Sequence, residues 1–183
     1  ESDALPGLVI DKYNQVYVFQ LHTAGMESLR NVIIEAIKKT FNPKTIYERS
    51  DVNVRLKEGL KECPRRHIFG DKIEGEIEIM ENGIAMLVDI VHGQKTGMFL
   101  DQRENRKALQ KYVNGKKVLN CFSYTAGFSL YAALAGASHV VSVDISKDAL
   151  ATARRNFEAY NLNPYEYEFV YADVFYYLDK CIT

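Results

Sequence analysis

The sequence predicts an α/β protein in which a parallel sheet with crossover helices follows a small α+β domain. Past Gly93, apolar strand-like runs alternate with segments of helical periodicity, a pattern typical of parallel sheets. Before Gly93, short runs of β-branched and aromatic residues flank polar turns, which is typical of hairpins. We therefore expect two domains, residues 1–93 and 94–183, with the boundary near residue 93.

The first domain is expected to hold two hairpins and a helix. Apolar residues recur every three or four positions from Met26 to Phe41, which predicts one helix face that ends near Asn42-Pro43 and covers the first hairpin. The remaining expected elements are strands at 8–13 and 16–22, a strand at 45–47, a charged stretch at 48–62 and a hairpin of 76–80 with 84–90.

The second domain is expected to alternate helix and strand. Asp101 and Glu104 have the spacing of an N-terminal helix cap, Ser146 has the position of another, and Gly115 and Gly136 end helices. The expected elements are a helix after 101, a strand at 118–122, a helix at 125–135, a strand at 140–145, a helix after 146, a strand at 169–171 and a helix begun near 175.

Composition limits the classes of protein to consider. The chain has 183 residues, of which 47% are hydrophobic and 26% charged, as expected for a globular protein with a packed core. The formal net charge of −1 gives no whole-chain electrostatic footprint for nucleic acid, so any RNA contact must be local. Three cysteines without a CxxC pair indicate neither a disulfide framework nor a zinc site, and no histidine has metal-ligand spacing.

No apolar run approaches the roughly 20 residues of a membrane span. No signal peptide is recognisable, so a reducing cytoplasm is the expected location. The chain begins without Met. Together with the ending described below, this predicts a piece of a longer protein.

The richest candidate site is the loop after the strand at 118–122. A ligand of an open α/β sheet lies outside the carboxyl ends of the strands, which points to Phe122, Ser123, Tyr124, Thr125 and Gly127. Phe122, Tyr124 and Ala126 occupy positions where a dinucleotide fingerprint would have glycines, so NAD is disfavoured. S-adenosylmethionine has no phosphate and needs fewer glycines; an ordinary strand-to-helix loop is the alternative.

Acidic residues follow the next two strands. Asp144 lies 24 residues after Asn120, close to the offset at which a carboxylate meets ribose hydroxyls; helix capping is the alternative. Asp173 follows the third strand and is a candidate acceptor for an adenine amino group, with Val174 or Ile145 packed on the ring. A surface loop aspartate is the alternative there.

Cationic residues precede the first strand of the second domain. Lys95 and Arg103 are candidates to pair with a ligand carboxylate. From spacing alone, a solvated helix start is the more common outcome for this stretch. Arg65, Arg66 and His67 form a second basic group, a candidate for phosphate contact or simply surface charge.

Several of these segments resemble one family. Tyr47-Glu48-Arg49-Ser50-Asp51-Val52, Glu81-Asn82-Gly83, Gly93-Gln94-Lys95-Thr96-Gly97 with Phe99-Leu100-Asp101-Gln102-Arg103, and Phe122-Ser123-Tyr124-Thr125 resemble those of the bacterial and archaeal methyltransferases that include the large-subunit ribosomal RNA cytosine-C5 enzymes.

The resemblance runs from about Leu5 to the end of the chain and implies a Rossmann-like class I methyltransferase sheet. It also implies S-adenosylmethionine as cofactor, ribosomal RNA as substrate, Asp144 on the ribose, Asp173 near the adenine and the 122–127 loop around the methionine moiety. This chain departs from the family at Asn120, where Asp is usual, and at Ala126, where Gly is usual.

The chemistry of C5 methylation requires a cysteine thiolate that first adds to C6 of cytosine. In the family, this cysteine and an Asp-Pro-Pro motif lie beyond the third strand, so the resemblance implies a truncated sheet and a chain that supplies the cofactor-binding half without catalysing transfer alone. Cys121 lies in an apolar strand and Cys63 in the other domain; we expect neither to be the nucleophile.

The sequence thus predicts an S-adenosylmethionine-dependent RNA methyltransferase, with no membrane association and no indication of oligomeric state. A related guanine-N7 RNA methyltransferase and a non-catalytic RNA-binding module remain the alternatives.

Overall fold

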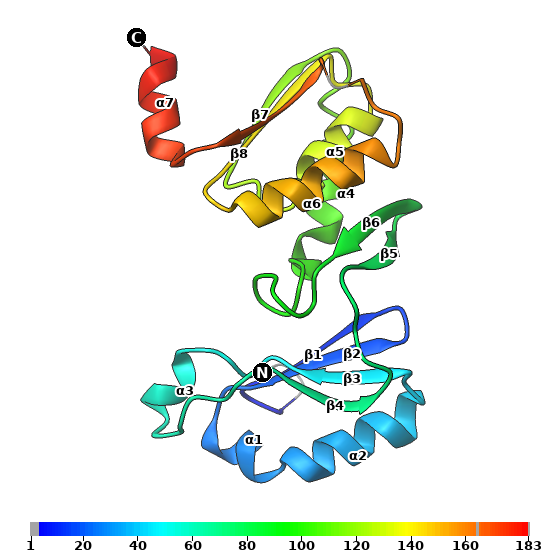
Figure 1. Cartoon of the computed structure of the whole chain (residues 1–183), viewed down its shortest axis with the longest axis vertical. Helices are drawn as coiled ribbons and strands as arrows, with labels where there is room; N and C mark the ends of the chain where they lie inside the picture. The colour runs from blue at the N-terminus through cyan, green and yellow to red at the C-terminus, as the bar shows by residue number, and fades with distance from the viewer. Residues whose placement is uncertain (1–3, 164, 183) are drawn as a thin grey trace. The chain divides into compact units, whose positions relative to one another are not determined.

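The computed structural model describes residues 4–163 and 165–182 and divides into two compact units (Figure 1). Unit 1 comprises the residues up to Ile77 together with Val88–Met98, and unit 2 comprises Glu78–Leu87 together with the residues from Phe99 onward. The prediction of one boundary near residue 93 therefore differs from the observed grouping, in which the chain passes between the units three times.

Unit 1 is built on a four-stranded mixed sheet of order β1-β2-β3-β4. β1 pairs antiparallel with β2, β2 pairs parallel with β3, and β3 pairs antiparallel with β4. The strands are β1 (Leu8–Tyr13), β2 (Val16–Leu21), β3 (Thr45–Glu48) and β4 (Arg66–Gly70). The first three agree with the sequence prediction, whereas β4 lies just after the charged stretch and was not predicted.

The helical segment of unit 1 covers the β1–β2 hairpin, as predicted, but as two helices, α1 (Ala24–Ser28) and α2 (Arg30–Phe41). The core between helices and sheet consists of Tyr17, Phe19, Leu21, Met26, Ile33, Ile37 and Ile46. α2 ends at Asn42, whose φ of 45° is the left-handed conformation of a helix C-cap. A short helix, α3 (Val54–Lys57), follows β3.

The second hairpin, β5 (Ile77–Glu81) with β6 (Ile84–Val88), belongs mostly to unit 2. Backbone groups of β6 bond to side chains of a helix in that unit: Ala85 N–H donates to the Tyr160 hydroxyl at 2.6 Å, and Leu87 N–H donates to Asn156 Oδ1 at 2.7 Å. These bonds explain why the hairpin does not group with the first domain, where the sequence placed it.

Unit 2 contains a three-stranded parallel sheet of order β7-β8-β9. Its strands are β7 (Lys117–Cys121), β8 (His139–Asp144) and β9 (Tyr167–Tyr171), and its helices are the 3-10 helix η1 (Leu100–Gln102), α4 (Arg103–Leu109), α5 (Gly127–Leu134), α6 (Lys147–Glu158) and α7 (Val174–Ile182). α5 and α6 pack on one face of the sheet (Figure 1). The predicted α/β fold class is confirmed.

Two predicted helix caps have different outcomes. Ser146 caps α6, since its Oγ accepts from Ala149 N–H at 3.2 Å. The prediction of Asp101 as a cap is wrong: the chain makes a turn of 3-10 helix through Asp101, and the residue at the start of α4 is Gln102. Within the described part of the chain, no helix is both long enough and apolar enough to cross a membrane.

Candidate functional site

The carboxyl ends of β7, β8 and β9 meet at one edge of the unit 2 sheet. Asp144 is the last residue of β8 and lies opposite Tyr171, the last residue of β9, while Cys121 ends β7. Because the three strands are parallel, the loops that follow them leave from this edge. The candidate residues of the 122–127 loop, Asp144 and Asp173 are therefore brought to the same end of the sheet, as predicted.

Asp144 is buried, and both of its carboxylate oxygens accept hydrogen bonds. Oδ2 accepts from Tyr124 N–H at 2.7 Å, and Oδ1 accepts from Ser146 N–H at 2.8 Å. An ionised carboxylate has about four acceptor positions, so these two bonds fix the orientation of the group and leave capacity for two further donors. Helix capping was the alternative role predicted for Asp144. Ser146 performs it instead, because its own side chain caps α6.

The loop after β7 has an unusual backbone. Phe122, Tyr124 and Ala126 adopt left-handed conformations with φ of 56°, 50° and 55°. This conformation costs a residue with a Cβ about 1 to 2 kcal/mol. A dinucleotide-binding fingerprint would have glycine at these three positions. The chain therefore keeps the geometry of a glycine-rich loop without its glycines, and such strain is concentrated at functional sites.

Ser123 lies at the centre of this loop with an unused polar group. Its N–H donates to Val143 O at 3.0 Å, but its Oγ is buried and has no hydrogen-bond partner among the described residues. A buried hydroxyl left without a partner costs about 1 to 3 kcal/mol. α5 begins directly after the loop, and its N-cap, Ala126, provides no side-chain acceptor. Loop and helix start thus present donors suited to a carboxylate.

Apolar surface adjoins the strand ends. Phe122 is 63% exposed and packs edge-on against Phe175 with ring centroids 5.8 Å apart, and Ile145 is 67% exposed. Val174 is only 2% exposed and lies in the core. Of the two residues predicted to pack on an adenine ring, Ile145 therefore has free surface and Val174 does not.

Asp173 has a structural role in α7. It is exposed, and its Oδ1 accepts from Tyr176 N–H at 2.9 Å, which is the arrangement of a helix cap. The other oxygen, Oδ2, takes no part in this bond. Contact with an adenine amino group stays a prediction for this residue.

The remaining predicted site residues lie in different places. Thr125 is partly buried in the loop, Gly127 is the first residue of α5, and Arg103 begins α4 with its exposed guanidinium bonded to Glu104 at 3.1 Å. Lys95 is exposed and belongs to unit 1. The structure therefore groups Arg103 with the loop residues in one unit and Lys95 in the other.

The loop that carries Lys95 is anchored within unit 1. Arg49 Nη2 donates to Gly93 O at 2.7 Å, and the Tyr13 hydroxyl bonds to Thr96 Oγ1 at 2.8 Å. Thr96 Oγ1 in turn donates to Asp11 Oδ2 at 2.6 Å. These buried and partly buried contacts fix the backbone on both sides of Lys95.

A buried polar cluster supports the loop after β7 and was not predicted from the sequence. Arg106 donates from Nε and Nη2 to the two carboxylate oxygens of Glu81 at 2.7 and 2.8 Å, and from Nη1 to Phe99 O at 3.0 Å. The Phe99 ring packs edge-on against Tyr124 with centroids 5.7 Å apart. The β5–β6 hairpin is thereby connected through Arg106 and Phe99 to the loop that binds Asp144.

Asn120 contributes to the support beneath the loop. Its Nδ2 donates to Ser129 Oγ at 2.9 Å, and Ser142 Oγ donates to the same atom at 2.7 Å. Asn120 therefore bonds to a residue of α5.

Residues 59–180 match a sequence profile described as S-adenosylmethionine-dependent methyltransferase. The chain is 53% identical over 176 residues to "Ribosomal RNA large subunit methyltransferase I" of Photobacterium profundum, an alignment that covers 96% of this chain and 44% of that protein. It is 47% identical over 175 residues to the protein of the same name from Escherichia coli O9:H4, with the same shares covered. The chain thus spans less than half the length of these relatives.

Two solved structures are also similar to this chain, and it again covers less than half of each. The structure titled "A putative sam-dependent methyltransferase from Streptococcus mutans" is 33% identical with a TM-score of 0.87, and the match covers 100% of this chain and 46% of that one. The structure titled "Crystal structure of SMU.776, a putative methyltransferase complexed with SAH" is also 33% identical with a TM-score of 0.86, and the match covers 98% of this chain and 45% of that one.

Proposed function

The chain belongs to the S-adenosylmethionine-dependent methyltransferase family, and from this premise we propose that it forms the cofactor-binding part of an enzyme that methylates cytosine C5 of ribosomal RNA. The single observation that carries the cofactor-binding part of this proposal is the environment of Asp144. This buried carboxylate ends the middle strand, is oriented by two backbone N–H groups and keeps acceptor capacity for two hydroxyls.

The residues at the strand ends fit S-adenosylmethionine part by part. Asp144 would accept from the ribose hydroxyls, Ile145 would contact the adenine, and Asp173 Oδ2 would accept from its amino group. The buried Ser123 hydroxyl and the start of α5 would meet the methionine carboxylate, together with Arg103 of the same unit. When bound, the cofactor supplies an electrophilic methyl group, and the strained loop from Phe122 to Ala126 shapes its place.

The RNA substrate and the target atom are inferred from relatives. Two relatives at 53% and 47% identity are named as methyltransferases of large-subunit ribosomal RNA, which supports an RNA substrate. This similarity favours neither guanine-N7 transfer nor a non-catalytic RNA-binding module. The cytosine-C5 assignment rests on the resemblance of the motifs alone.

We assign no catalytic nucleophile among the three cysteines of this chain. Cys63 is buried in unit 1, Cys181 is exposed on α7, and Cys121 is partly buried at the end of β7.

Calorimetric titration with S-adenosylhomocysteine tests the cofactor site. Replacing Asp144 by Asn removes the negative charge and one acceptor oxygen but keeps the other, so about 1.5 to 3 kcal/mol of binding should be lost and the Kd should rise by roughly 10- to 150-fold. Asp148→Asn is the matched control, because Asp148 is exposed in the first turn of α6. Equal affinity of Asp144→Asn and wild type would overturn the ribose assignment.

A folding check accompanies this titration because Asp144 also binds Tyr124 N–H. Circular dichroism establishes whether Asp144→Asn is folded. Ser123→Ala gives a second measurement, since its hydroxyl has no partner among the described residues and its loss should not lower stability. Ser123→Ala should weaken binding of S-adenosylhomocysteine with the Tm unchanged or raised; unaltered binding would remove Ser123 from the site.

A further inference from the structure

We infer that unit 1 carries a binding site for a phosphate of the RNA backbone, in a surface hollow beside Cys63. This inference rests on the proposed function, since it takes RNA as the substrate. The hollow, called here the arginine hollow, has a volume of about 220 Å³. The charged residues that line it are Glu27, Arg30, Arg55, Lys61, Glu62 and Arg66.

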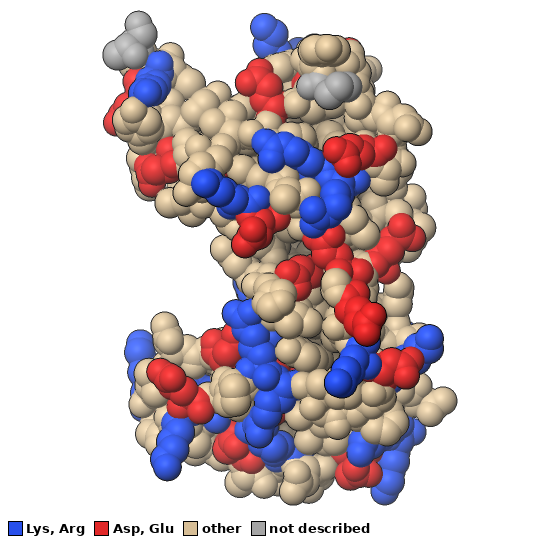
Figure 2. Space-filling view, in the orientation of Figure 1, with Lys and Arg blue, Asp and Glu red and all other residues tan. Residues whose placement is uncertain are grey.

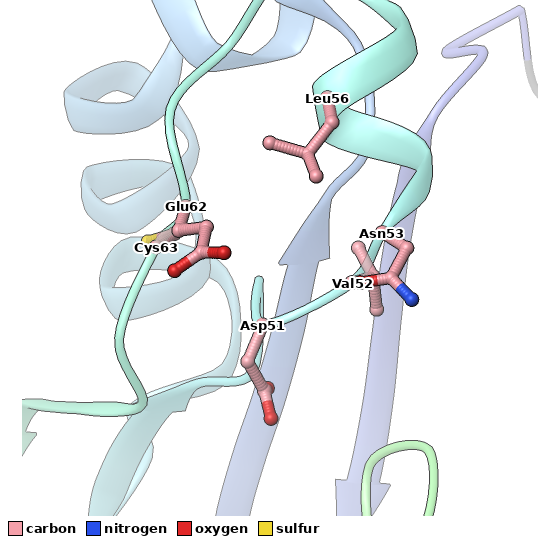
Figure 3. Close-up of a pocket in the computed structure, with 6 residues that line it drawn as sticks. All are labelled: Asp51, Val52, Asn53, Leu56, Glu62 and Cys63. Carbon is pink, nitrogen blue, oxygen red and sulfur yellow. The ribbon is translucent and has the colours of Figure 1, made fainter.

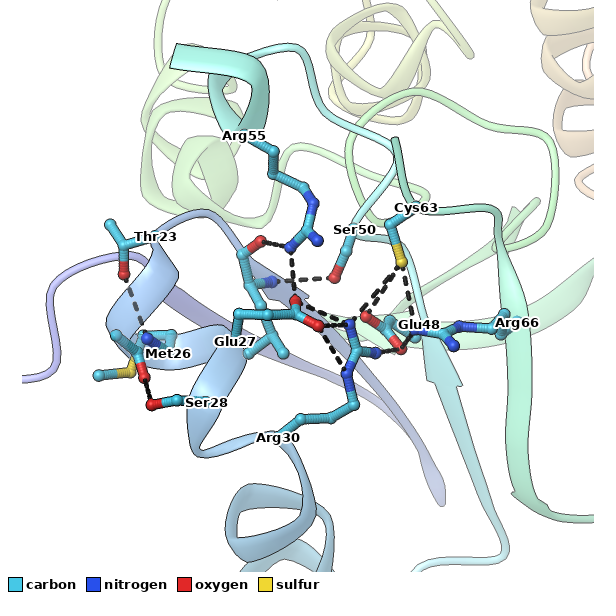
Figure 4. A network of polar contacts seen from close by, with 12 residues as sticks. Thr23, Met26, Glu27, Ser28, Arg30, Glu48, Ser50, Arg55, Cys63 and Arg66 are labelled. Carbon is cyan, nitrogen blue, oxygen red and sulfur yellow. Dashed lines mark hydrogen bonds and ion pairs between the residues drawn. The ribbon is translucent and has the colours of Figure 1, made fainter. Parts of the chain in front are cut away.

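One buried and one partly buried carboxylate hold the arginines of this hollow in place (Figure 4). Glu48 is fully buried and pairs with both Arg30 and Arg66. Glu27 pairs with Arg30 at 2.6 Å and with Arg55 at 2.9 Å. Although burial acts to raise the pKa of Glu27, hydrogen bonds from these two arginines lower it below its usual value. The guanidinium groups are therefore ordered before any ligand arrives, which reduces the entropy lost on binding.

Positive charge remains after these pairings. Three arginines and Lys61 line the hollow together with the carboxylates of Glu27 and Glu62. When the buried Glu48 carboxylate, which pairs with Arg30, is counted as well, the net charge of the group is +1. The side chain of Arg66 is 41% exposed and uses only Nη2, at 3.0 Å from Glu48 and 3.2 Å from Cys63 Sγ. Its Nε and Nη1, like Lys61 Nζ, have no partner among the described residues. These are the groups that a ligand would meet.

The neighbouring hollow gives a useful contrast (Figure 3). It has a volume of about 190 Å³ and also reaches Cys63, but its charged residues are Asp51 and Glu62, and no lysine or arginine lines it. Anion binding is therefore assigned to the arginine hollow and not to this one.

A polymer phosphate suits the arginine hollow better than a small enclosed ligand. Guanidinium groups match the geometry of phosphate oxygens, and Arg66 begins β4, an outer strand of the unit 1 sheet. Between residues 55 and 66 the chain has five basic residues and two acidic ones, so local charge is positive although the whole chain is not. Figure 2 shows Lys and Arg side chains gathered in a column on one face of unit 1.

Salt-dependent RNA binding tests the inference with the full chain and a fluorescein-labelled RNA hairpin. Lys61→Ala/Arg66→Gln removes two phosphate contacts, so the Kd should rise about 10-fold or more at low salt, and the slope of log K against log[salt] should fall by about 1 to 2. The matched control is Lys39→Ala/Arg154→Gln, which removes the same charge from exposed positions outside the hollow. Equal losses in the two double variants would overturn the inference.

Further measurements separate the possible failures. Lys61→Glu leaves the Arg66–Glu48 pair intact and should weaken RNA binding more than Lys39→Glu, even if the double variant fails to fold. Inorganic phosphate should displace RNA from the wild type better than chloride does at equal ionic strength, and this difference should disappear in Lys61→Ala/Arg66→Gln. Binding of inorganic phosphate that is tighter than binding of the RNA hairpin would assign the hollow to the free anion and overturn the RNA inference. The wild-type chain could bind no S-adenosylhomocysteine while Lys61→Ala/Arg66→Gln still loses RNA binding selectively. That result would support the arginine hollow and contradict the proposed function.

Discussion

Asp144 Oδ2 accepts a hydrogen bond from the backbone N–H of Tyr124, 2.7 Å away, so one carboxylate joins the end of β8 to the loop after β7. Tyr124 is one of three non-glycine residues in that loop with positive φ. The group proposed to bind the ribose is thus also a group that holds the strained loop. Loop order and cofactor binding should therefore depend on each other, because both use the same carboxylate.

The strain in the loop predicts a specific pattern of glycine substitutions. Ala126 and Ala132 are both fully buried, but Ala126 has φ of 55° whereas Ala132 lies inside α5. Both changes to Gly delete one buried methyl group and loosen the unfolded chain. Only Ala126→Gly also relieves the left-handed conformation. Ala126→Gly should therefore be less destabilising than Ala132→Gly, and the free energies of unfolding of the two variants should differ by about 1 to 2 kcal/mol.

Urea unfolding monitored by circular dichroism measures this difference. The cost of Gly inside a helix, about 1 kcal/mol relative to Ala, sets the scale for the Ala132→Gly control. If Ala126→Gly destabilises as much as Ala132→Gly, the left-handed backbone at Ala126 stores no strain in solution.

The position of the candidate site residues in the fold was predictable because it depends on sequence-local features. Buried strands, the residues that end them and the cap at Ser146 all follow from periodicity and spacing, and the structure places Asp144 and the 122–127 loop at one sheet edge. The predicted glycine-like positions coincide with the residues of positive φ. That non-glycine residues adopt this conformation was not predictable, since only tertiary contacts such as the Tyr124–Asp144 bond impose it.

Other features depend on contacts between residues distant in sequence. Arg106 pairs with Glu81 across 25 positions, and β6 bonds to Tyr160 across 75, and no periodic pattern marks such pairs. The sequence therefore assigned the β5–β6 hairpin to the first domain. β4 was missed for a related reason: most of its residues are exposed, so it lacks the alternating apolar pattern of a half-buried strand.

The Glu81–Arg106 pair should be strongly coupled in unit 2. Both side chains are almost fully buried, and the pair is bidentate. Arg106→Met leaves the Glu81 carboxylate buried without its partner, which should lower the free energy of unfolding by about 3 to 5 kcal/mol. In Glu81→Gln/Arg106→Met no charge is left buried, so this double variant should be more stable than Arg106→Met alone.

A double-mutant cycle in urea measures the coupling between the two side chains. Arg103→Met is the control, since the Arg103–Glu104 pair is exposed and should contribute no more than about 1 kcal/mol. Additive effects of Glu81→Gln and Arg106→Met would contradict a coupled pair.

Tyr131 should make stability depend on alkaline pH. Burial and the adjacent Glu81 carboxylate raise the pKa of Tyr131 to about 12, although the bond from Asn82 acts in the opposite direction. In the unfolded chain the pKa is close to 10. Because the folded pKa is the higher one, the contribution is fully present below pH 10 and is lost as the pH rises from about 10 to about 12.

Comparison of the wild type with Tyr131→Phe isolates this contribution from the other titrating groups. At neutral pH the wild type should be the more stable, because the Tyr131 hydroxyl donates to Glu81 O at 2.9 Å and accepts from Asn82 at 3.1 Å. The gap in the free energy of unfolding should narrow as the pH rises from 10 to 12, in urea titrations at constant ionic strength. Tyr112→Phe, at a residue 75% exposed, should change stability little throughout. A gap for Tyr131→Phe that stays constant over this range would mean that the hydroxyl does not titrate differently in the folded and unfolded chains.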